Sequence, residues 1–487
     1  MNLQNQNDPP RLPRVLGTTE TLCAIVGSVI GSGIFIVPST IARDVPSIGG
    51  IALVWILGGL FTLAGALTIA ELGAMLPRAG GSYVYLYEAY GRLPAFLFGW
   101  TEFLIIRAGS VATLAAAFSL FFTSVVDAPM GISIGYWRML VALAAMAIVA
   151  VINVLGTKKS GKVQVLGTGL KLAAIAAMMI LPFVLGKADS SRLTPVFPVQ
   201  WNGALFKGML AAMIGVLWSY DGWVNMSSLA EDIKDPGRTI PKALFMSVAI
   251  LIGVYLGLTL SYHLVLSMSE IASAAKSAKG GTSHIVASEF CFALLGKDGL
   301  TAIAIVVMCS TFISLNGNAL AGPRAYFAMA RDGLFPKALS RLHPRFQTPA
   351  NAIVAQTVWA MLLMILGTIL TELPEPTKPV SGLAATTLAA LRAHPLYDLL
   401  FTYVIFGGTV FYTLAIASVF VLRVRRPDLP RPYKTTFYPF TPIFYMLSAC
   451  LILTSMLIQS FVPSLAGLLI ILAGIPAFAF FQKTEAG

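Results

Sequence analysis

Long apolar runs separated by short polar connections make up most of this chain. A helix needs about 20 apolar residues to cross the hydrocarbon core of a bilayer. Twelve runs reach that length, and because lipid offers backbone groups no hydrogen-bond partners, we predict an all-α membrane protein with twelve transmembrane helices. The predicted spans are residues 18–43, 49–76, 92–125, 136–155, 163–186, 206–231, 242–267, 299–328, 350–371, 397–423, 439–460 and 463–481.

Two longer polar segments interrupt this pattern. Residues 268–298 contain Gly280-Gly281 among mixed polar residues, so we expect an outer loop with a short surface helix. Residues 372–396 resemble them and contain several proline breakers. Neither segment has the composition of a soluble domain, and the first 17 residues are predicted to form a short tail.

Composition and charge agree with a protein embedded in lipid. The chain is 57% hydrophobic and 11% charged, whereas a soluble domain carries about 25% charged residues. With both termini inside, the inner segments hold 21 basic residues and the outer segments hold 10. Since basic residues gather in cytoplasmic loops, we predict cytoplasmic termini in a cell membrane. The net charge of +12 has the same origin, and no continuous basic stripe indicates nucleic acid.

Catalytic and metal-binding patterns are not evident in the sequence. Its four cysteines and four histidines are scattered without ligand spacing or an evident disulfide framework. There is also no G-x-x-x-x-G-K-[ST] phosphate loop. We therefore expect no metal, no cofactor and no enzymatic activity.

The first span is interrupted by glycines. Gly27, Gly31 and Gly33 fall within seven residues, and each weakens a helix by about 1 kcal/mol relative to alanine. Close helix packing through small residues is the structural alternative to a functional break.

The sixth span favours the functional interpretation. It contains Trp218-Ser219-Tyr220-Asp221-Gly222, which places a carboxylate, a hydroxyl and a glycine near the middle of the membrane. A charged side chain there costs roughly 2.5–3.5 kcal/mol or more, so polar partners or a water-filled cavity are expected.

Interrupted helices at matching places in two halves of a chain indicate a transporter binding site. At such a break, the N–H groups that open the second half-helix attract an anion, and the carbonyl groups that end the first half-helix attract a cation. An α-amino acid carries both charges, so it is the substrate class that the two breaks predict.

The residues of the two breaks and several short motifs resemble those of the amino acid–polyamine–organocation transporters, and most closely those of the L-type amino acid transporter branch. The resemblance extends over spans one to ten and is expected to include all twelve. The motifs are Ile30-Gly31-Ser32-Gly33-Ile34-Phe35, Ala70-Glu71-Leu72-Gly73, Gly80-Gly81-Ser82-Tyr83, Leu104-Ile105-Ile106-Arg107, Leu315-Asn316-Gly317 and Leu422-Arg423 with Arg426-Pro427.

The resemblance implies a LeuT-type fold with alternating access. Two five-helix inverted repeats would cover residues 18–186 and 206–423, and two additional helices would cover 439–481. Spans 1, 2, 6 and 7 would form the moving bundle, and spans 3, 4, 8 and 9 the scaffold.

The resemblance also assigns the substrate site to the two breaks. Backbone N–H groups of the first break would hold the carboxylate, near Ser32, Gly33 and Ile34. Carbonyl groups of both breaks would hold the amino group, near Val29, Ile30, Trp218 and Ser219. The Trp218 ring would be an aromatic gate over the substrate, and Asp221 and Gly222 complete the predicted set.

A lysine inside span five has an implied role as well. In sodium-independent relatives, a lysine at the position of Lys171 replaces a sodium ion. Its ammonium would bridge Gly27 to hydroxyl groups on span eight, with Ser310, Thr311 and Ser314 as candidates. Release of a proton from a desolvated lysine is the alternative, which leaves exchange and proton coupling both open.

The remaining intramembrane charges have less specific predictions. Arg107 matches an arginine on span three and is expected to be structural or to take part in gating. Glu71 and Glu231 are expected near the inner ends of their spans, solvated or capping a loop. Asp221 occupies a position that is usually glycine in the eukaryotic members, so it favours a hydroxylated or cationic substrate or else caps the half-helix that follows.

Eukaryotic members of the resembling branch carry a cysteine between spans three and four that is joined to a glycoprotein heavy chain. Residues 125–131 contain no cysteine, so we expect a prokaryote-like, stand-alone protein. The predicted function is sodium-independent exchange of neutral L-amino acids across the bilayer. The alternative is a proton-coupled permease for amino acids or polyamines.

Overall fold

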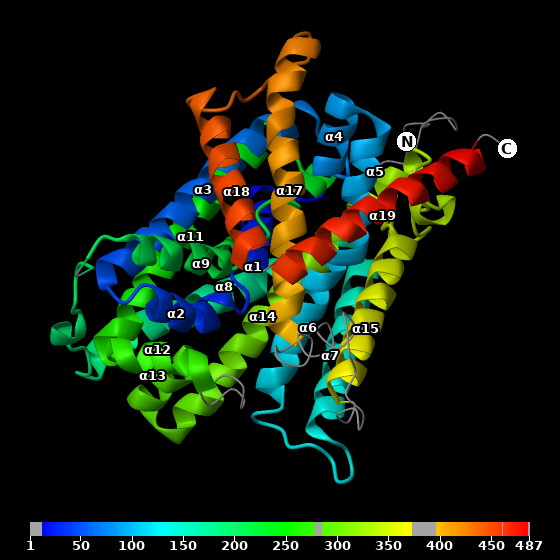
Figure 1. Ribbon diagram of the computed structural model, residues 1–487. Helices are drawn as coiled ribbons and strands as arrows, with labels where there is room; N and C mark the ends of the chain where they lie inside the picture. The colour runs from blue at the N-terminus through cyan, green and yellow to red at the C-terminus, as the bar shows by residue number, and fades with distance from the viewer. Residues whose placement is uncertain (1–11, 199, 278–284, 373–395, 460, 486–487) are drawn as a thin grey trace, which may run out of the picture.

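The computed structural model describes residues 12–198, 200–277, 285–372, 396–459 and 461–485, and these residues form a bundle of α-helices (Figure 1). Within the described residues the only β-type pairing is an isolated bridge between Leu16 and Ile233. The helices are α1 Thr18–Val29, α2 Gly33–Asp44, α3 Ile48–Met75, α4 Ser82–Tyr90, α5 Arg92–Thr101, α6 Arg107–Phe122, α7 Ile134–Val154, α8 Thr157–Val184, α9 Gly203–Tyr220, α10 Asn225–Ser228, α11 Pro236–Val265, α12 Met268–Ser277, α13 Val286–Leu295, α14 Lys297–Arg331, α15 Ala350–Glu372, α17 Leu396–Arg425, α18 Phe440–Gln459 and α19 Phe461–Glu485.

The predicted twelve-span, all-α architecture is confirmed. Among the described residues, 11 helices are long and apolar enough to cross a membrane, and the bent pair α1 and α2 makes a twelfth span. α5 and α6 form one span joined by a π-helical segment, Glu102–Ile106. The observed bounds agree closely with the prediction at span nine, which was expected at 350–371 and covers Ala350–Glu372.

The outer polar segment 268–298 differs from its prediction. It contains two short helices, α12 and α13, instead of one. α13 is apolar and buries one side against α14, which explains why this region needs more than a solvated surface helix. The second polar insert lies almost entirely at 373–395, outside the described residues.

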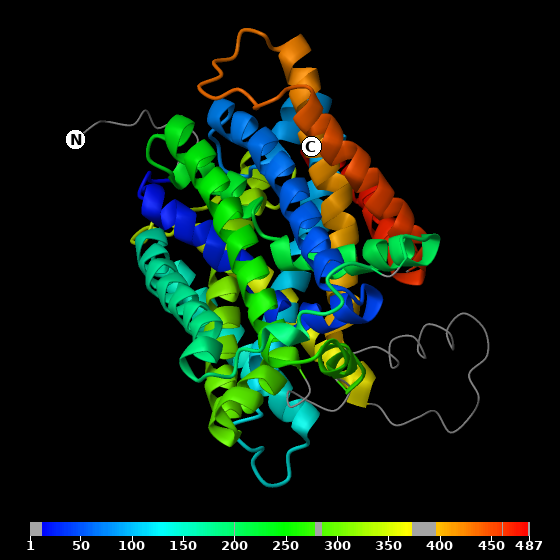
Figure 2. The same ribbon diagram turned by 90° about the vertical axis from the view of Figure 1, so that its left-hand side faces the viewer.

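The broken first span lies in the interior of the bundle, where α1 contacts α8, α11 and α14 (Figure 1). Most of the long helices run along one common direction (Figure 2). α18 and α19 pack against α17 on the outside. The division into two inverted repeats plus two additional helices remains a prediction.

Both ends of the described chain lie on the same face of the bundle. The N-terminal segment is bound there through the Leu12 N–H, which donates to the Glu231 carboxylate at 2.7 Å. At the other end, the ring of Phe481 lies 5.9 Å from that of Phe335, just beyond α14. Since α14 ends at Arg331, the two ends and the inner end of α14 share one face.

Buried carboxylates hold the loops of this face in place. Glu71 is fully buried and accepts hydrogen bonds from the N–H and the hydroxyl of Thr435, both at 2.7 Å, and from Arg423 at 2.6 Å. Glu231 accepts from the Ala79 N–H at 2.8 Å in addition to Leu12. Of the two alternatives for these glutamates, loop capping is therefore the one that the structure shows.

Replacing Glu71 with alanine is expected to destabilise the fold by about 3 kcal/mol, because it leaves buried donors and a guanidinium unpaired. The measurement is thermal or denaturant unfolding of the purified protein in detergent. Arg43→Gln is the matched control, since its ion pair with Asp44 is at the surface and contributes about 1 kcal/mol or less. Equal losses in the two variants would contradict the assignment.

Candidate functional site

The first span is broken between two half-helices. α1 ends at Val29, α2 begins at Gly33, and their axes differ by 45°. Residues 30–32 are not helical, so α1 ends with carbonyl groups that have no partner one turn ahead. The first N–H groups of α2 likewise have no carbonyl one turn behind. The short break therefore presents the partial negative charge of carbonyl groups from α1 and the partial positive charge of N–H groups from α2.

The Lys171 ammonium binds the carbonyl groups of this break. It donates to the Gly27 carbonyl at 2.9 Å, to the Ile30 carbonyl, and to the Ser314 hydroxyl at 3.1 Å. Lys171 is 1% exposed, so a whole positive charge is buried against α1. The ammonium joins α8, the end of α1 and α14.

Two of the three predicted hydroxyl groups also contact the break. Ser314 donates to the Gly27 carbonyl at 2.8 Å and to that of Ile30 at 2.9 Å, and Ser310 donates to those of Ile30 and Gly31, both at 3.0 Å. Thr311 does not take part. Its hydroxyl donates to Val307 and Met308 carbonyls of its own helix, because it lies on a different side of α14.

The sixth span is broken as well. α9 ends at Tyr220, and the four-residue α10 begins at Asn225. Gly222 has a φ of 107°, a conformation that strains any other residue, and this glycine lets the chain turn between the two helices.

The two breaks pack directly against each other. A Cβ atom at Gly33 would lie 2.9 Å from the Cα atom of Ser219, so only glycine allows this approach. A Cβ atom at Gly222 would in turn meet α1 at 3.4 Å, on the carbonyl carbon of Ser28.

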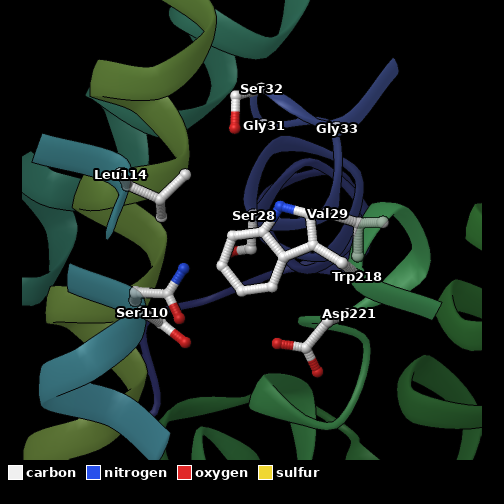
Figure 3. Close-up of a pocket in the computed structure, with 10 residues that line it drawn as sticks. Ser28, Val29, Gly31, Ser32, Gly33, Ser110, Leu114, Trp218 and Asp221 are labelled. Atoms are coloured by element: carbon white, nitrogen blue, oxygen red, sulfur yellow. The ribbon is translucent and has the colours of Figure 1, made fainter. Parts of the chain in front are cut away.

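A small cavity lies between the two breaks and the helices α6 and α14. Figure 3 shows the indole of Trp218 across this cavity, with the Asp221 carboxylate and the Ser110 hydroxyl pointing into it. The residues that line it are Ser28, Val29, Gly31, Ser32, Gly33, Ser110, Leu114, Trp218, Asp221 and Asn318.

Five of the predicted substrate residues therefore line the cavity: Val29, Ser32, Gly33, Trp218 and Asp221. Four others lie beside it: Ile30, Ile34, Ser219 and Gly222. The Ile30 carbonyl faces the Lys171 ammonium and two serine hydroxyl groups, and Ile34 belongs to the hydrophobic core. The Ile30 carbonyl is thus occupied by the protein's own cation.

The other predicted carbonyl groups also have protein partners. The Val29 carbonyl accepts from the Gly31 N–H at 2.8 Å, and the Trp218 carbonyl accepts from the Asp221 N–H at 3.2 Å. The Ser219 carbonyl accepts from the Tyr255 hydroxyl. A carbonyl oxygen has two lone pairs, so the carbonyl groups of Val29 and Ser219 can each accept a further donor.

Asp221 does not cap the half-helix that follows the sixth break, as one of our alternatives proposed. The residue before α10 is Val224, and no side chain caps that helix. Asp221 ends α9 instead, three residues earlier, and it also lines a second small cavity together with Phe61, Tyr412 and Tyr445. Its carboxylate thus lies between two cavities.

Arg107 is buried beside Asn318, one of the residues that line the cavity. Its guanidinium pairs with Glu102 and donates to the side-chain oxygens of Asn225 and Asn318, the latter at 2.7 Å. These contacts connect α6 to the segment after the sixth break and to α14. The sequence did not identify these partners, and two of them, Asn225 and Asn318, come from distant parts of the chain.

Two further arginines hold the same segment of the chain. Arg324 pairs with Asp232 at 3.2 Å, and both side chains are fully buried. Burial raises the pKa of the Asp232 carboxyl above its ordinary value, and the Arg324 guanidinium opposes that rise. Arg331, two turns further along α14, pairs with Glu231 at 3.3 Å. Together with Arg107, these bridges connect residues 225–232 to α6 and α14.

Sequence reasoning missed several cavity residues: Ser28, Ser110, Leu114 and Asn318. The available signal was weak. Ser110 follows Arg107 by one helical turn, and Asn318 stands directly after the Leu315-Asn316-Gly317 motif. Small polar side chains are common in membrane helices, so only their convergence in space marks them as a site.

Comparison with known proteins agrees with this architecture. A family model described as amino acid permease matches residues 16–476. The chain is 31% identical to the serine/threonine exchanger SteT of Bacillus subtilis over 98% of both chains. It is 28% identical to the human cystine/glutamate transporter, over 97% of this chain and 86% of that one.

A third relative is also named as an amino acid transporter. The human b(0,+)-type amino acid transporter 1 is 29% identical, over 87% of this chain and 79% of that protein. The family match covers both broken spans, the buried lysine and the arginine bridges. This protein therefore belongs to the amino acid permease family, and it is a multi-pass membrane transporter rather than a member of an enzyme family.

Proposed function

We propose that this protein exchanges neutral L-amino acids by alternating access and does so without sodium. The observation that carries the proposal is the Lys171 ammonium bound to the carbonyl groups of the first break. Those carbonyl groups form a cation site, and the lysine fills it permanently. A transporter with a built-in cation needs no sodium ion to organise the break for each cycle.

The zwitterionic head of an amino acid fits the rest of the break. The N–H groups at the start of α2, near Ser32 and Gly33, suit its carboxylate. The second lone pair of the Val29 carbonyl group suits its ammonium. The Trp218 ring lies across the cavity, where it can restrict access to a bound substrate (Figure 3).

The cavity lining favours small substrates with a polar side chain. Serine hydroxyl groups of Ser28 and Ser110, the Asn318 amide and the Asp221 carboxylate face a limited space. Relatives include one named as a serine/threonine exchanger and one named as a cystine/glutamate transporter, so exchange of amino acids is an activity of this family's members. We therefore expect serine and threonine among the substrates.

Alternating access requires the inner bridges to open. Arg107, Arg324 and Arg331 belong to α6 and α14, which would be part of the scaffold, and they hold residues 225–232 after the sixth break. Their separation would let the substrate leave toward the inner face. We propose a cell-membrane location with cytoplasmic termini, because the basic residues concentrate on that face.

We also propose that the protein works without a heavy-chain subunit. The connection between α6 and α7 contains no cysteine that could bond to one.

Exchange is tested in proteoliposomes loaded with unlabelled L-serine. We expect internal serine to stimulate uptake of labelled L-serine several-fold, and replacing sodium with choline or potassium to leave the rate unchanged. Empty liposomes and liposomes loaded with an unrelated solute are the controls. Uptake that does not depend on internal amino acid, or that requires sodium, would refute the proposal.

Lys171→Met is expected to reduce exchange at least tenfold. It keeps the length of the side chain but removes charged hydrogen bonds, which contribute about 1.5–3 kcal/mol each. Substrate-induced thermal stabilisation should fall with it. Lys187→Met is the matched control, because the Lys187 ammonium also donates to two backbone carbonyls, Ala293 and Leu294, but at the outer surface. Full exchange by Lys171→Met would remove the basis of the sodium-independent site.

A proton-coupled permease for amino acids or polyamines is the second candidate. It is favoured by the position of Asp221 between the substrate cavity and a cavity walled by the rings of Phe61, Trp223, Tyr412 and Tyr445. A carboxylate beside aromatic faces suits a cationic side chain.

Asp221→Asn separates the two candidates. For a neutral exchanger, we expect this variant to retain serine exchange within about fivefold, because the amide keeps the size of the carboxylate and one acceptor oxygen. For a cation or proton carrier, it should abolish uptake of labelled lysine or putrescine and remove any stimulation by an inward proton gradient. The two assays are run on the same preparation, with the wild-type protein as reference.

A further inference from the structure

We propose that Gly317 of α14 is a positioning residue that sets the size of the substrate side chain the cavity admits. It leaves room beside α14 for the hydroxyl group of Ser28, and a larger residue at 317 would force that hydroxyl into the cavity. The proposal rests on the proposed function only in taking amino acids as the ligands of the cavity. Gly317 does not line the cavity, so it acts on the substrate through Ser28.

Ser28 and Gly317 meet where α1 packs against α14. Ser28 is 5% exposed, and its hydroxyl donates to the Ala24 carbonyl, one turn back on α1, at 2.6 Å. A Cβ atom at Gly317 would lie 2.0 Å from the Oγ atom of Ser28 and 3.1 Å from its Cβ atom. Gly317 is buried within the helix α14. What the glycine provides is therefore the space that the Ser28 hydroxyl fills.

Gln164 of α8 bounds the same space. Its amide nitrogen lies 3.2 Å from the position of a Cβ atom at Gly317, and its amide oxygen accepts from the Asn316 amide at 2.8 Å. The Asn316 oxygen in turn accepts from Asn153 of α7 at 3.0 Å. Because amide groups from three helices hold one another here, Ser28 cannot be displaced toward α8 without breaking their hydrogen bonds.

The substrate cavity is the open space beside Ser28. Ser28 lines this cavity together with residues of α6, α9 and α14 (Figure 3). A close-packed interior has little room to absorb an added methyl group, so a displaced side chain moves toward an existing void. A methyl group at 317 would therefore turn the Ser28 hydroxyl into the cavity, where it would occupy space that a substrate side chain needs.

A substrate would be affected by this displacement according to the size of its side chain. Threonine differs from serine by one methyl group. A difference of one methyl or methylene group in a pocket changes discrimination about 10- to 200-fold. The loss is therefore expected to be larger for threonine than for serine, although residue 317 touches neither amino acid.

The test compares Gly317→Ala with the wild-type protein in proteoliposome exchange of labelled L-serine and labelled L-threonine. The measured quantity is the ratio of kcat/KM for threonine to kcat/KM for serine. We expect Gly317→Ala to lower this ratio at least tenfold. An equal loss for both amino acids would show that the glycine serves helix packing alone, and it would overturn the proposal.

Gly167→Ala is the matched control. Gly167 lies on α8, and a Cβ atom there would meet the side chain of Ile313 on α14 at 2.0 Å, which is the distance found for Gly317 and Ser28. Ile313 is not among the residues that line the cavity. The control should therefore lower Tm and keep the wild-type ratio. A similar change of the ratio in the control would contradict a specific role of Gly317.

The double variant Gly317→Ala/Ser28→Ala tests whether the effect passes through the Ser28 hydroxyl. Alanine at 28 removes the oxygen and leaves only the contact at 3.1 Å, which a shift of a few tenths of an ångström relieves. The ratio should return to within about threefold of that for Ser28→Ala alone. A double variant that discriminates against threonine as strongly as Gly317→Ala would refute the proposed connection.

Ser28→Cys covers the case in which Gly317→Ala does not fold. Sulfur is larger than oxygen, so the side chain outgrows its space beside Gly317 while α14 keeps its sequence. We expect the ratio to fall about threefold or more. A folded Ser28→Cys protein with the wild-type ratio would overturn the proposal. If the wild-type protein exchanges neither amino acid, the proposed function fails instead, so the two failures are distinguishable.

Discussion

The buried ammonium of Lys171 is the interaction on which the rest of the site depends. A helix broken in mid-membrane leaves carbonyl groups that water cannot reach, and each unpaired group is costly. Lys171 satisfies two of them and recruits Ser314, so that one side chain joins α8, α1 and α14. The same contacts also stabilise the lysine. A buried ammonium needs negatively polarised partners, and the carbonyl oxygens of the break provide them.

Other charged groups in the bundle follow the same physical rule. Arg107, Arg324 and Glu71 are each buried, and each is paired with an opposite charge. Removing one member of such a pair would leave an uncompensated buried charge, which costs about 3–5 kcal/mol. Each of these charges is therefore compatible with burial only while its partner is present.

The proposed substrate site is built from backbone groups rather than from a set of charged side chains. The two breaks touch at Gly33 and Ser219, and the donors of neighbouring helices decide which carbonyl groups remain available. In the proposed site, selectivity among amino acids would depend on a few side chains that line the cavity, chiefly Ser110, Asn318 and Asp221. Relatives named for different amino acids would then differ in such side chains while they share the backbone site.

The sequence alone determined the twelve spans, the two breaks and the importance of Lys171, because hydrophobic length, glycine spacing and a charge inside an apolar run are local properties. It did not identify Ser110, Asn318 or Tyr255, and it left Asp221 with several roles. Only the tertiary structure decided which side chains converge on the cavity and which face Lys171. That decision depends on helix rotation and packing, which place Ser310 and Ser314 against the break and turn Thr311 away from it.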